Sequence, residues 1–308
     1  MKRLADVAVV GGGLLVGALL VGVAFGGRGP LEPALPAAPA PAPRGPDPGM
    51  EVPRTVEGLF LGQSGSLRFV QVTAGEPIVD PLLKDYLAPL VGRPPGVYDI
   101  GLHAPDGDRI AVLSLVPFRA KIGPALKGYS IGFWPDEARR TRSPRYPLPQ
   151  GFVEVTRGNQ FTKLSKRFEL KDFVTKDQGG VWPKFVVIDQ SVVDKLELIS
   201  DELTRMGRPS RVVILSGFRT PEHNRTREVG GASDSRHMYG DAADIIIDQD
   251  RDGIMDDLNR DGRSDWRDAR LLGAVIERVE SFYPDLKGGL GVYPGSVHTD
   301  TRGVRARW

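Results

Sequence analysis

The sequence contains no cysteine among its 308 residues. This absence excludes disulfide bonds, thiolate metal sites and a lipoprotein anchor, because each of them needs a cysteine thiol. Histidine is scarce, with four residues, and the formal net charge is only +2. A balance this close to neutrality gives no electrostatic reason to expect nucleic acid as a partner. Any zinc site in this chain must use histidine and carboxylate ligands.

The N-terminal end of the chain carries a long apolar run. Lys2 and Arg3 precede residues 7–25, a stretch of about nineteen residues that is near the minimum for a helix crossing a bilayer. The positive start predicts a cytoplasmic N-terminus with the rest of the chain outside. We therefore expect residues 1–27 to anchor the protein in a membrane, and a cleaved signal peptide is the alternative.

Two further segments precede the region that carries recognisable chemistry. Residues 28–50 are rich in proline and alanine, a composition typical of an extended tether without a packed core. Residues 51–165 alternate apolar and polar side chains as strands do, and a hairpin turn is expected at 105–108. We predict a β-rich domain there, which could bind glycan, bind a protein or cover an active site. His103, beside the turn, is expected to be a surface histidine.

A histidine and an aspartate seven residues apart give the first sign of a metal site. His237 and Asp244 are separated by Gly240, and an apolar run, 245–247, follows the aspartate as a strand. His298 lies near the C-terminus, after a strand predicted over 290–293. Two imidazoles and one carboxylate with a free fourth position form the ligand set of a catalytic zinc site.

The chain from residue 168 to 308 resembles the zinc D-alanyl-D-alanine carboxypeptidase and murein endopeptidase family, whose fold is shared with the Hedgehog signalling domain. Three segments carry the resemblance: Ser216–Asn224, Ser235–Asp244 and Val297–Asp300. It implies an α+β fold in which helices pack on an antiparallel sheet with a zinc ion in a cleft. The zinc would be held by His237, Asp244 and His298.

The resemblance also implies roles for neighbouring residues. Arg219 would hold a substrate carboxylate or the developing oxyanion, although a structural salt bridge is the alternative. Ser235 would hydrogen-bond to substrate at the wall of the site. Many family members carry a glutamate base three residues before the last histidine, where this chain has Gly295. Asp300 is therefore a candidate to orient a ligand, to bind metal or to accept a proton.

Helical periodicity places two long helices in the C-terminal part. Residues 191–206 have one apolar face, and Ser191 with Asp194 approximates a capping box at the start. A second helix is expected over 265–282, with Trp266, Ala269, Leu272, Val275, Ile276 and Val279 on its apolar face. A buried strand over 212–215 and a short helix over 221–229 lie between the first helix and the metal motif.

An acidic insertion, residues 248–268, follows the strand that begins at the Asp244 position. Oxygen-bearing side chains recur at the first, third and fifth positions of two overlapping loops, with a glycine at the sixth, as in calcium-binding loops. The insertion resembles the calcium loops of dockerin and thrombospondin type 3 repeats, and a solvated acidic loop is the alternative. The expected Ca²⁺ ligands are Asp248, Asp250, Asp252, Ile254, Asp256, Asp257, Asn259, Asp261, Asp265 and Asp268.

Together these patterns predict a zinc metallopeptidase domain over 166–308, anchored in the cytoplasmic membrane with its body in the periplasm. The expected partner is peptidoglycan, whose stem peptides or cross-links would be hydrolysed with zinc polarising the scissile carbonyl. A wall-binding or protein-binding module that keeps zinc and calcium only for structure is the alternative. A third hypothesis is that the calcium loops dock a partner protein.

Overall fold

A computed structural model of the chain describes residues 54–55, 61–79, 81–137, 144–226 and 228–308. The chain divides into two compact units, Met1–Gly45 and Pro46–Trp308, and every described residue belongs to the second. The predicted anchor and the whole of the predicted tether lie outside the described residues. No helix within the described ranges is long and apolar enough to cross a membrane.

The first sheet has six strands and contains the predicted hairpin. Its order is β1 (Arg54–Thr55), β3 (Gly96–His103), β4 (Arg109–Pro117), β7 (Gly151–Val155) and β8 (Lys184–Val186), and β2 (Phe69–Thr73) also pairs with β4. β3 and β4 run antiparallel on either side of the turn at 105–108. The minor elements of this part are α1 (Pro81–Leu87), η1 (Ala88–Leu90), η2 (Phe118–Ala120), β5 (Ala125–Leu126) and β6 (Tyr129–Ser130).

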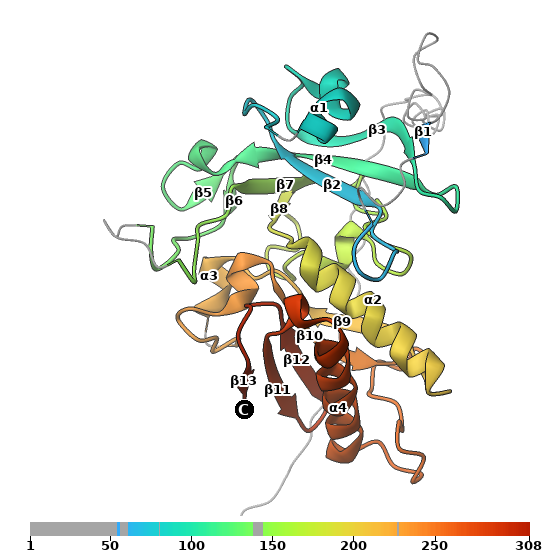
Figure 1. The fold of residues 1–308 in the computed structure, drawn as a ribbon. Helices are drawn as coiled ribbons and strands as arrows, with labels where there is room; N and C mark the ends of the chain where they lie inside the picture. Colours follow the sequence, from blue (N-terminus) through green and yellow to red (C-terminus); the bar gives the residue numbers. More distant parts are fainter. Residues whose placement is uncertain (1–53, 56–60, 80, 138–143, 227) are drawn as a thin grey trace, which may run out of the picture. The chain divides into compact units, whose positions relative to one another are not determined.

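The second sheet has five strands and carries the metal motif (Figure 1). Its order is β13 (Ala306–Arg307), β11 (Gly289–Tyr293), β12 (Ser296–Asp300), β10 (Ala242–Ile247) and β9 (Val212–Ser216). β9, β10, β12 and β11 pair with one another antiparallel, whereas β13 pairs parallel with β11. β10 is an interior strand of the sheet, with β12 on one side and β9 on the other.

Two long helices accompany the sheets, near the predicted positions. α2 spans Gln190–Arg205 and α4 spans Trp266–Phe282, and the predicted apolar residues of both are buried except Trp266. Trp266 is 48% exposed, because it is the first residue of α4 and stacks under the Arg270 guanidinium instead of entering the core. The short helices are η3 (Leu170–Phe173), α3 (Pro221–Asn224), η4 (Arg236–Tyr239) and η5 (Pro284–Leu286).

The predicted capping box of the first long helix is wrong. Asp189 is the N-cap of α2, and its carboxylate accepts a hydrogen bond from the Ser191 N–H at 2.7 Å. Asp194 is buried one turn further on, and its carboxylate accepts from the backbone N–H groups of Gln63 and Ser64. The side chain that suggested a cap therefore binds a distant loop to the helix.

One large hydrophobic core joins the two sheets. It contains Phe69 and Phe152 from the first sheet, Leu196 from α2, Ile245 from β10 and Ile276 from α4, all of them buried. α2 begins near the first sheet, where the Gln190 side chain donates to the Phe69 carbonyl at 3.1 Å, and then packs along α4 (Figure 1). β8 belongs to the first sheet although it lies after residue 165. The domain boundary near residue 165 stays a prediction.

Candidate metal centre

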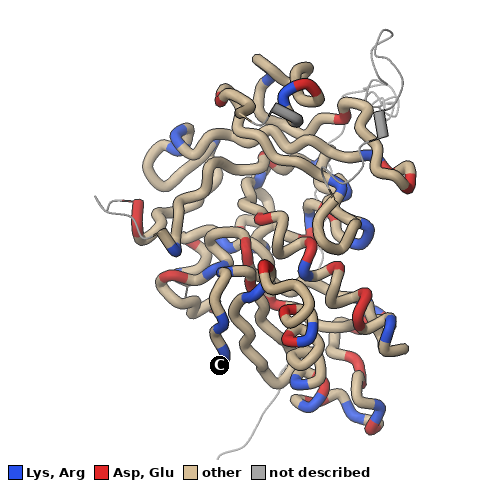
Figure 2. The backbone as a smooth tube through the Cα atoms, in the orientation of Figure 1, with Lys and Arg blue, Asp and Glu red and all other residues tan. Residues whose placement is uncertain are grey.

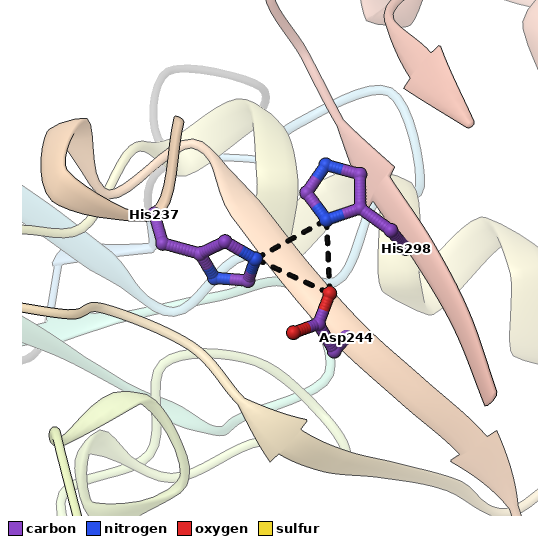
Figure 3. A group of neighbouring side chains, drawn as sticks. All are labelled: His237, Asp244 and His298. Atoms are coloured by element: carbon purple, nitrogen blue, oxygen red, sulfur yellow. Dashed lines mark hydrogen bonds and ion pairs between the residues drawn. The ribbon is translucent and has the colours of Figure 1, made fainter. Parts of the chain in front are cut away.

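Strand pairing brings two of the predicted zinc ligands face to face. In β10, Asp244 is directly opposite His298 of β12 on one side and Ser216 of β9 on the other. Directly opposed residues of an antiparallel pair project from the same face with their Cβ atoms about 5 Å apart. The sheet register therefore places one imidazole and one carboxylate together before any side-chain contact is considered (Figure 3).

A tight turn brings the third side chain to the same point. His237 lies in η4, which ends at Gly240 with φ +76°. A Cβ at this glycine would meet the Val187 carbonyl oxygen, and the Gly240 carbonyl accepts from the Asp189 N–H at 2.9 Å. Only glycine fits both the left-handed conformation and this close crossing. The turn returns the chain to β10 with His237 next to Asp244.

Three ligand atoms converge in the resulting group (Figure 3). His237 Nε2 lies 3.2 Å from Asp244 Oδ1 and 3.1 Å from His298 Nδ1, and His298 Nδ1 lies 2.9 Å from Asp244 Oδ1. Both imidazoles are buried, with 2% and 6% exposure. These are the nitrogen and oxygen donors that zinc prefers.

The hydrogen bonds of the outer ring nitrogens determine whether the inner nitrogens carry a proton or a free lone pair. His237 Nδ1 is 2.7 Å from the Gly217 carbonyl oxygen, and His298 Nε2 is 3.2 Å from Asp300 Oδ2. Both partners are hydrogen-bond acceptors, so each outer nitrogen carries the proton of the neutral ring. The inner nitrogens and Asp244 Oδ1 are then three mutually facing acceptors, an arrangement that requires a cation. The residues fit a metal ion.

The pKa shifts differ among the three members of the group. Burial lowers the pKa of His237. Burial also opposes the charging of His298, but its bonds to Asp244 and Asp300 outweigh this and raise its pKa. Burial alone would raise the pKa of Asp244, yet the two imidazoles hold it well below its usual range. Asp244 is therefore ionised and available as a ligand.

Arg219 contacts a ligand of the group directly. Its Nε donates to Ser216 Oγ at 2.7 Å, and its Nη2 forms an ion pair with Asp244 Oδ2. The guanidinium thus occupies one carboxylate oxygen and leaves Oδ1 to the two histidines. Arg219 also lines a pocket whose other walls include Thr175, Lys176 and His223. The salt bridge considered from the sequence is present, and the guanidinium borders a space where a substrate group could bind.

Asp300 lies behind His298 and is fully buried. Its carboxylate accepts from the Gly289 N–H at 2.7 Å and pairs with the Arg302 guanidinium. Burial would raise the pKa of Asp300, but the bonds to His298 and Arg302 outweigh it and hold the pKa well below its usual range. Asp300 bonds to the outer nitrogen of His298, on the side of the ring away from Asp244. This geometry favours orientation of the imidazole over proton transfer.

Several supporting groups carried no sequence signal. The Gly217 carbonyl and the Ser216 hydroxyl hold His237 and Arg219, but a backbone carbonyl or a single serine gives no pattern to recognise. Arg302 could have been recognised from the sequence, because it follows Asp300 by two residues and such residues project from the same face of an extended chain. Ser235, the predicted substrate-binding residue, is half-buried at the start of η4.

The predicted calcium ligands lie in the loop between β10 and α4. Three of them, Asp248, Asp250 and Asp256, form a second group of carboxylates able to hold a metal ion. Asp265 and Asp268 form the capping box of α4, and Ile254 is 59% exposed. Of the remaining side chains, those of Asp252, Asp257, Asn259 and Asp261 each accept a hydrogen bond from a nearby backbone N–H.

Asp300→Asn tests the orienting role. The amide lacks the charge that fixes the His298 tautomer, so zinc affinity is expected to fall about 10–100-fold, as when an outer partner of a metal-ligating histidine is lost. Excess zinc should then restore turnover. Zinc affinity is measured by competition with a chromophoric chelator. Arg302→Gln, which leaves the Asp300–His298 bond in place, is the matched control. Lost turnover with zinc fully retained would show instead that Asp300 acts in the chemistry.

The comparisons with known proteins agree with this geometry. Residues 166–265 match a family model described as Peptidase M15. No match was found among curated proteins or among solved structures. The matched range contains His237 and Asp244, whereas His298 lies beyond it. Over residues 166–265 the chain is thus similar to the M15 peptidases, which use zinc, and the His-Asp-His group could bind such an ion.

Proposed function

We propose that this protein is an extracytoplasmic zinc metallopeptidase that hydrolyses stem peptides or cross-links of peptidoglycan. The observation that carries the proposal is the set of three mutually facing acceptors at His237, Asp244 and His298, of which the first two lie inside the range matched by the M15 family. A zinc ion held there would supply Lewis acidity. The apolar run at 7–25 and the tether at 28–50 support an anchored protein that reaches the cell wall.

The residues around the group have separable tasks in this proposal. Asp300 fixes the His298 ring, and the Gly217 carbonyl fixes the His237 ring, so that both inner nitrogens stay unprotonated. Arg219 orients Asp244 through one end of its guanidinium and borders the pocket beside Ser216. A substrate carboxylate in that pocket would meet the positive charge of Arg219, which suits the free carboxylate or acidic groups of a stem peptide.

A non-catalytic wall-binding or protein-binding module is the second candidate. Gly295 stands where many family members have the glutamate base, and Asp300 is enclosed behind His298 with its oxygens occupied by Gly289, His298 and Arg302. A zinc site without a base would serve only to stabilise the fold. The two candidates differ in whether peptidoglycan is cleaved.

Analysis of muropeptides by mass spectrometry separates these candidates. Purified sacculi are incubated with the zinc-loaded protein, with and without a metal chelator. We expect new products that disappear when the chelator is present, and their masses identify the bond that is cut. An unchanged muropeptide profile from folded, zinc-loaded protein on several wall types would overturn the peptidase proposal in favour of the binding module.

A further inference from the structure

The loop between β10 and α4 contains a second group of possible metal ligands. It differs in chemistry from the group at His237, Asp244 and His298, because it consists of carboxylates alone. Oxygens of Asp248, Asp250 and Asp256 lie within 4.8 Å of one another. Asp248 directly follows the last residue of β10, so the group begins where this interior strand of the sheet ends. Aspartates and arginines are interspersed along this loop (Figure 2).

Asp248 is the observation that points to a ligand. The residue is 4% exposed, and its Oδ1 atom has no hydrogen-bond partner among the described residues. Its Oδ2 accepts from the Gly253 N–H at 3.3 Å and lies 3.6 Å from the Arg211 guanidinium. A buried carboxylate oxygen without a partner is costly, since it has lost water and gained nothing in return. A cation among the three carboxylates would satisfy it.

The electrostatics of the neighbouring carboxylates support the same conclusion. Asp250, Asp252 and Asp256 belong to the same loop as Asp248, and oxygens of Asp248, Asp250 and Asp256 lie within 4.8 Å of one another. Four carboxylates in one loop thus repel one another, and the Arg211 guanidinium offsets only part of this repulsion through Asp248. A divalent cation would turn that repulsion into attraction.

The second half of the loop provides an internal contrast. Nine residues further on, Asp257 occupies the position equivalent to Asp248. Its two oxygens accept from the N–H groups of Arg260, Asp261 and Gly262. Asp268, at the end of this half, accepts from the N–H groups of Leu258, Asn259 and Asp265. These carboxylates already have donors, whereas Asp248 retains an oxygen without one.

We propose that Asp248, Asp250 and Asp256 bind one Ca²⁺ ion. Hard oxygen donors carried by a loop suit calcium, which accepts six to eight oxygens in variable geometry, better than zinc or the strictly octahedral Mg²⁺. The ion adds a metal site that takes no part in the proposed hydrolysis. It would hold the start of the loop against the end of β10.

Isothermal titration calorimetry with CaCl₂ tests the site on the full-length, zinc-loaded protein. We expect one bound Ca²⁺ and a rise in the thermal unfolding midpoint of about 5 °C at saturation. Asp250→Asn should weaken Ca²⁺ binding at least about tenfold, because the affinity of such sites follows the number of charged ligands. Asp250 is exposed, and asparagine keeps the hydrogen bond that its Oδ1 accepts from the Asp252 N–H, so the variant should fold.

Asp261→Asn is the matched control from the second half of the loop. Asp261 is also exposed and accepts from the Arg263 N–H through its Oδ1, a bond that asparagine preserves. This variant should bind Ca²⁺ as the parent protein does, and the zinc content of both variants should be unchanged. Absence of heat and of a thermal shift up to about 10 mM Ca²⁺ would overturn the proposal. Equal loss of binding in the two variants would also overturn it.

Discussion

Replacing His237 with glutamine is expected to abolish metal binding and, under the proposed function, the hydrolysis of peptidoglycan. The imidazole supplies one of three inward-facing donor atoms, and its outer nitrogen is already committed to the Gly217 carbonyl. Changes to outer partners alone cost about 10–100-fold in metal affinity, so loss of a direct ligand should cost more than about 100-fold. Zinc content after dialysis, measured by mass spectrometry, and muropeptide release report the two effects.

His103→Gln is the matched control for this substitution. His103 lies on β3 in the first sheet, and its Nδ1 is 3.2 Å from the Gly101 carbonyl oxygen. We expect this variant to retain one zinc ion per chain and full activity. Retention of zinc by the His237→Gln variant would contradict the ligand assignment. Retained zinc with lost activity would place His237 in the reaction and leave the metal to other residues.

Replacing Lys195 with methionine is expected to lower the free energy of unfolding by about 3–5 kcal/mol, the cost of removing one partner from a buried ion pair. Lys195 is fully buried on α2, and its ammonium group donates to Glu280 Oε1 and to the Asp300 carbonyl, both at 2.8 Å. Burial lowers the pKa of Lys195, which shows how strongly the site penalises an unpaired charge. Methionine would leave the buried Glu280 carboxylate with only Arg307 and the Gly288 N–H.

Denaturant unfolding measures this effect, and Lys171→Met provides the comparison. Lys171 forms an ion pair with Glu169 on the surface, where its side chain is 42% exposed. A solvated pair of this kind contributes about 1 kcal/mol or less, so this variant should unfold almost as the parent does. A loss below about 1 kcal/mol in the Lys195→Met variant would show that the α2–α4 ion pair is not what holds these elements to β12.

The metal group could be predicted from the sequence because its geometry is mostly local. Seven residues and a glycine turn join His237 to Asp244, and the strand that carries His298 pairs with β10 at that very residue. Both long helices followed from apolar periodicity, whereas the antiparallel sheet was implied by the family resemblance. The position of Asp300 on the His298 side of β12 also followed from the two-residue repeat of a strand.

Long-range contacts account for what the sequence did not reveal. The capping box expected at Asp194 failed because the carboxylate binds backbone N–H groups about 130 residues away, which no local pattern can indicate. Trp266 matched the apolar periodicity of α4. It is the first residue of the helix, however, and its side chain stays exposed while the other apolar residues of that face are buried. The partner of Arg219 depended on the β9–β10 pairing, which fixes Asp244 opposite Ser216.

The crossing at Gly240 has a consequence for how this centre could be moved to another scaffold. Residues 237–244 reach their conformation only because the backbone near Val187 passes against the glycine and Asp189 donates to its carbonyl. A graft of the motif alone would lose the contact that shapes it. The transplantable unit is therefore discontinuous: it combines residues 187–189 and 237–244 with His298 on β12.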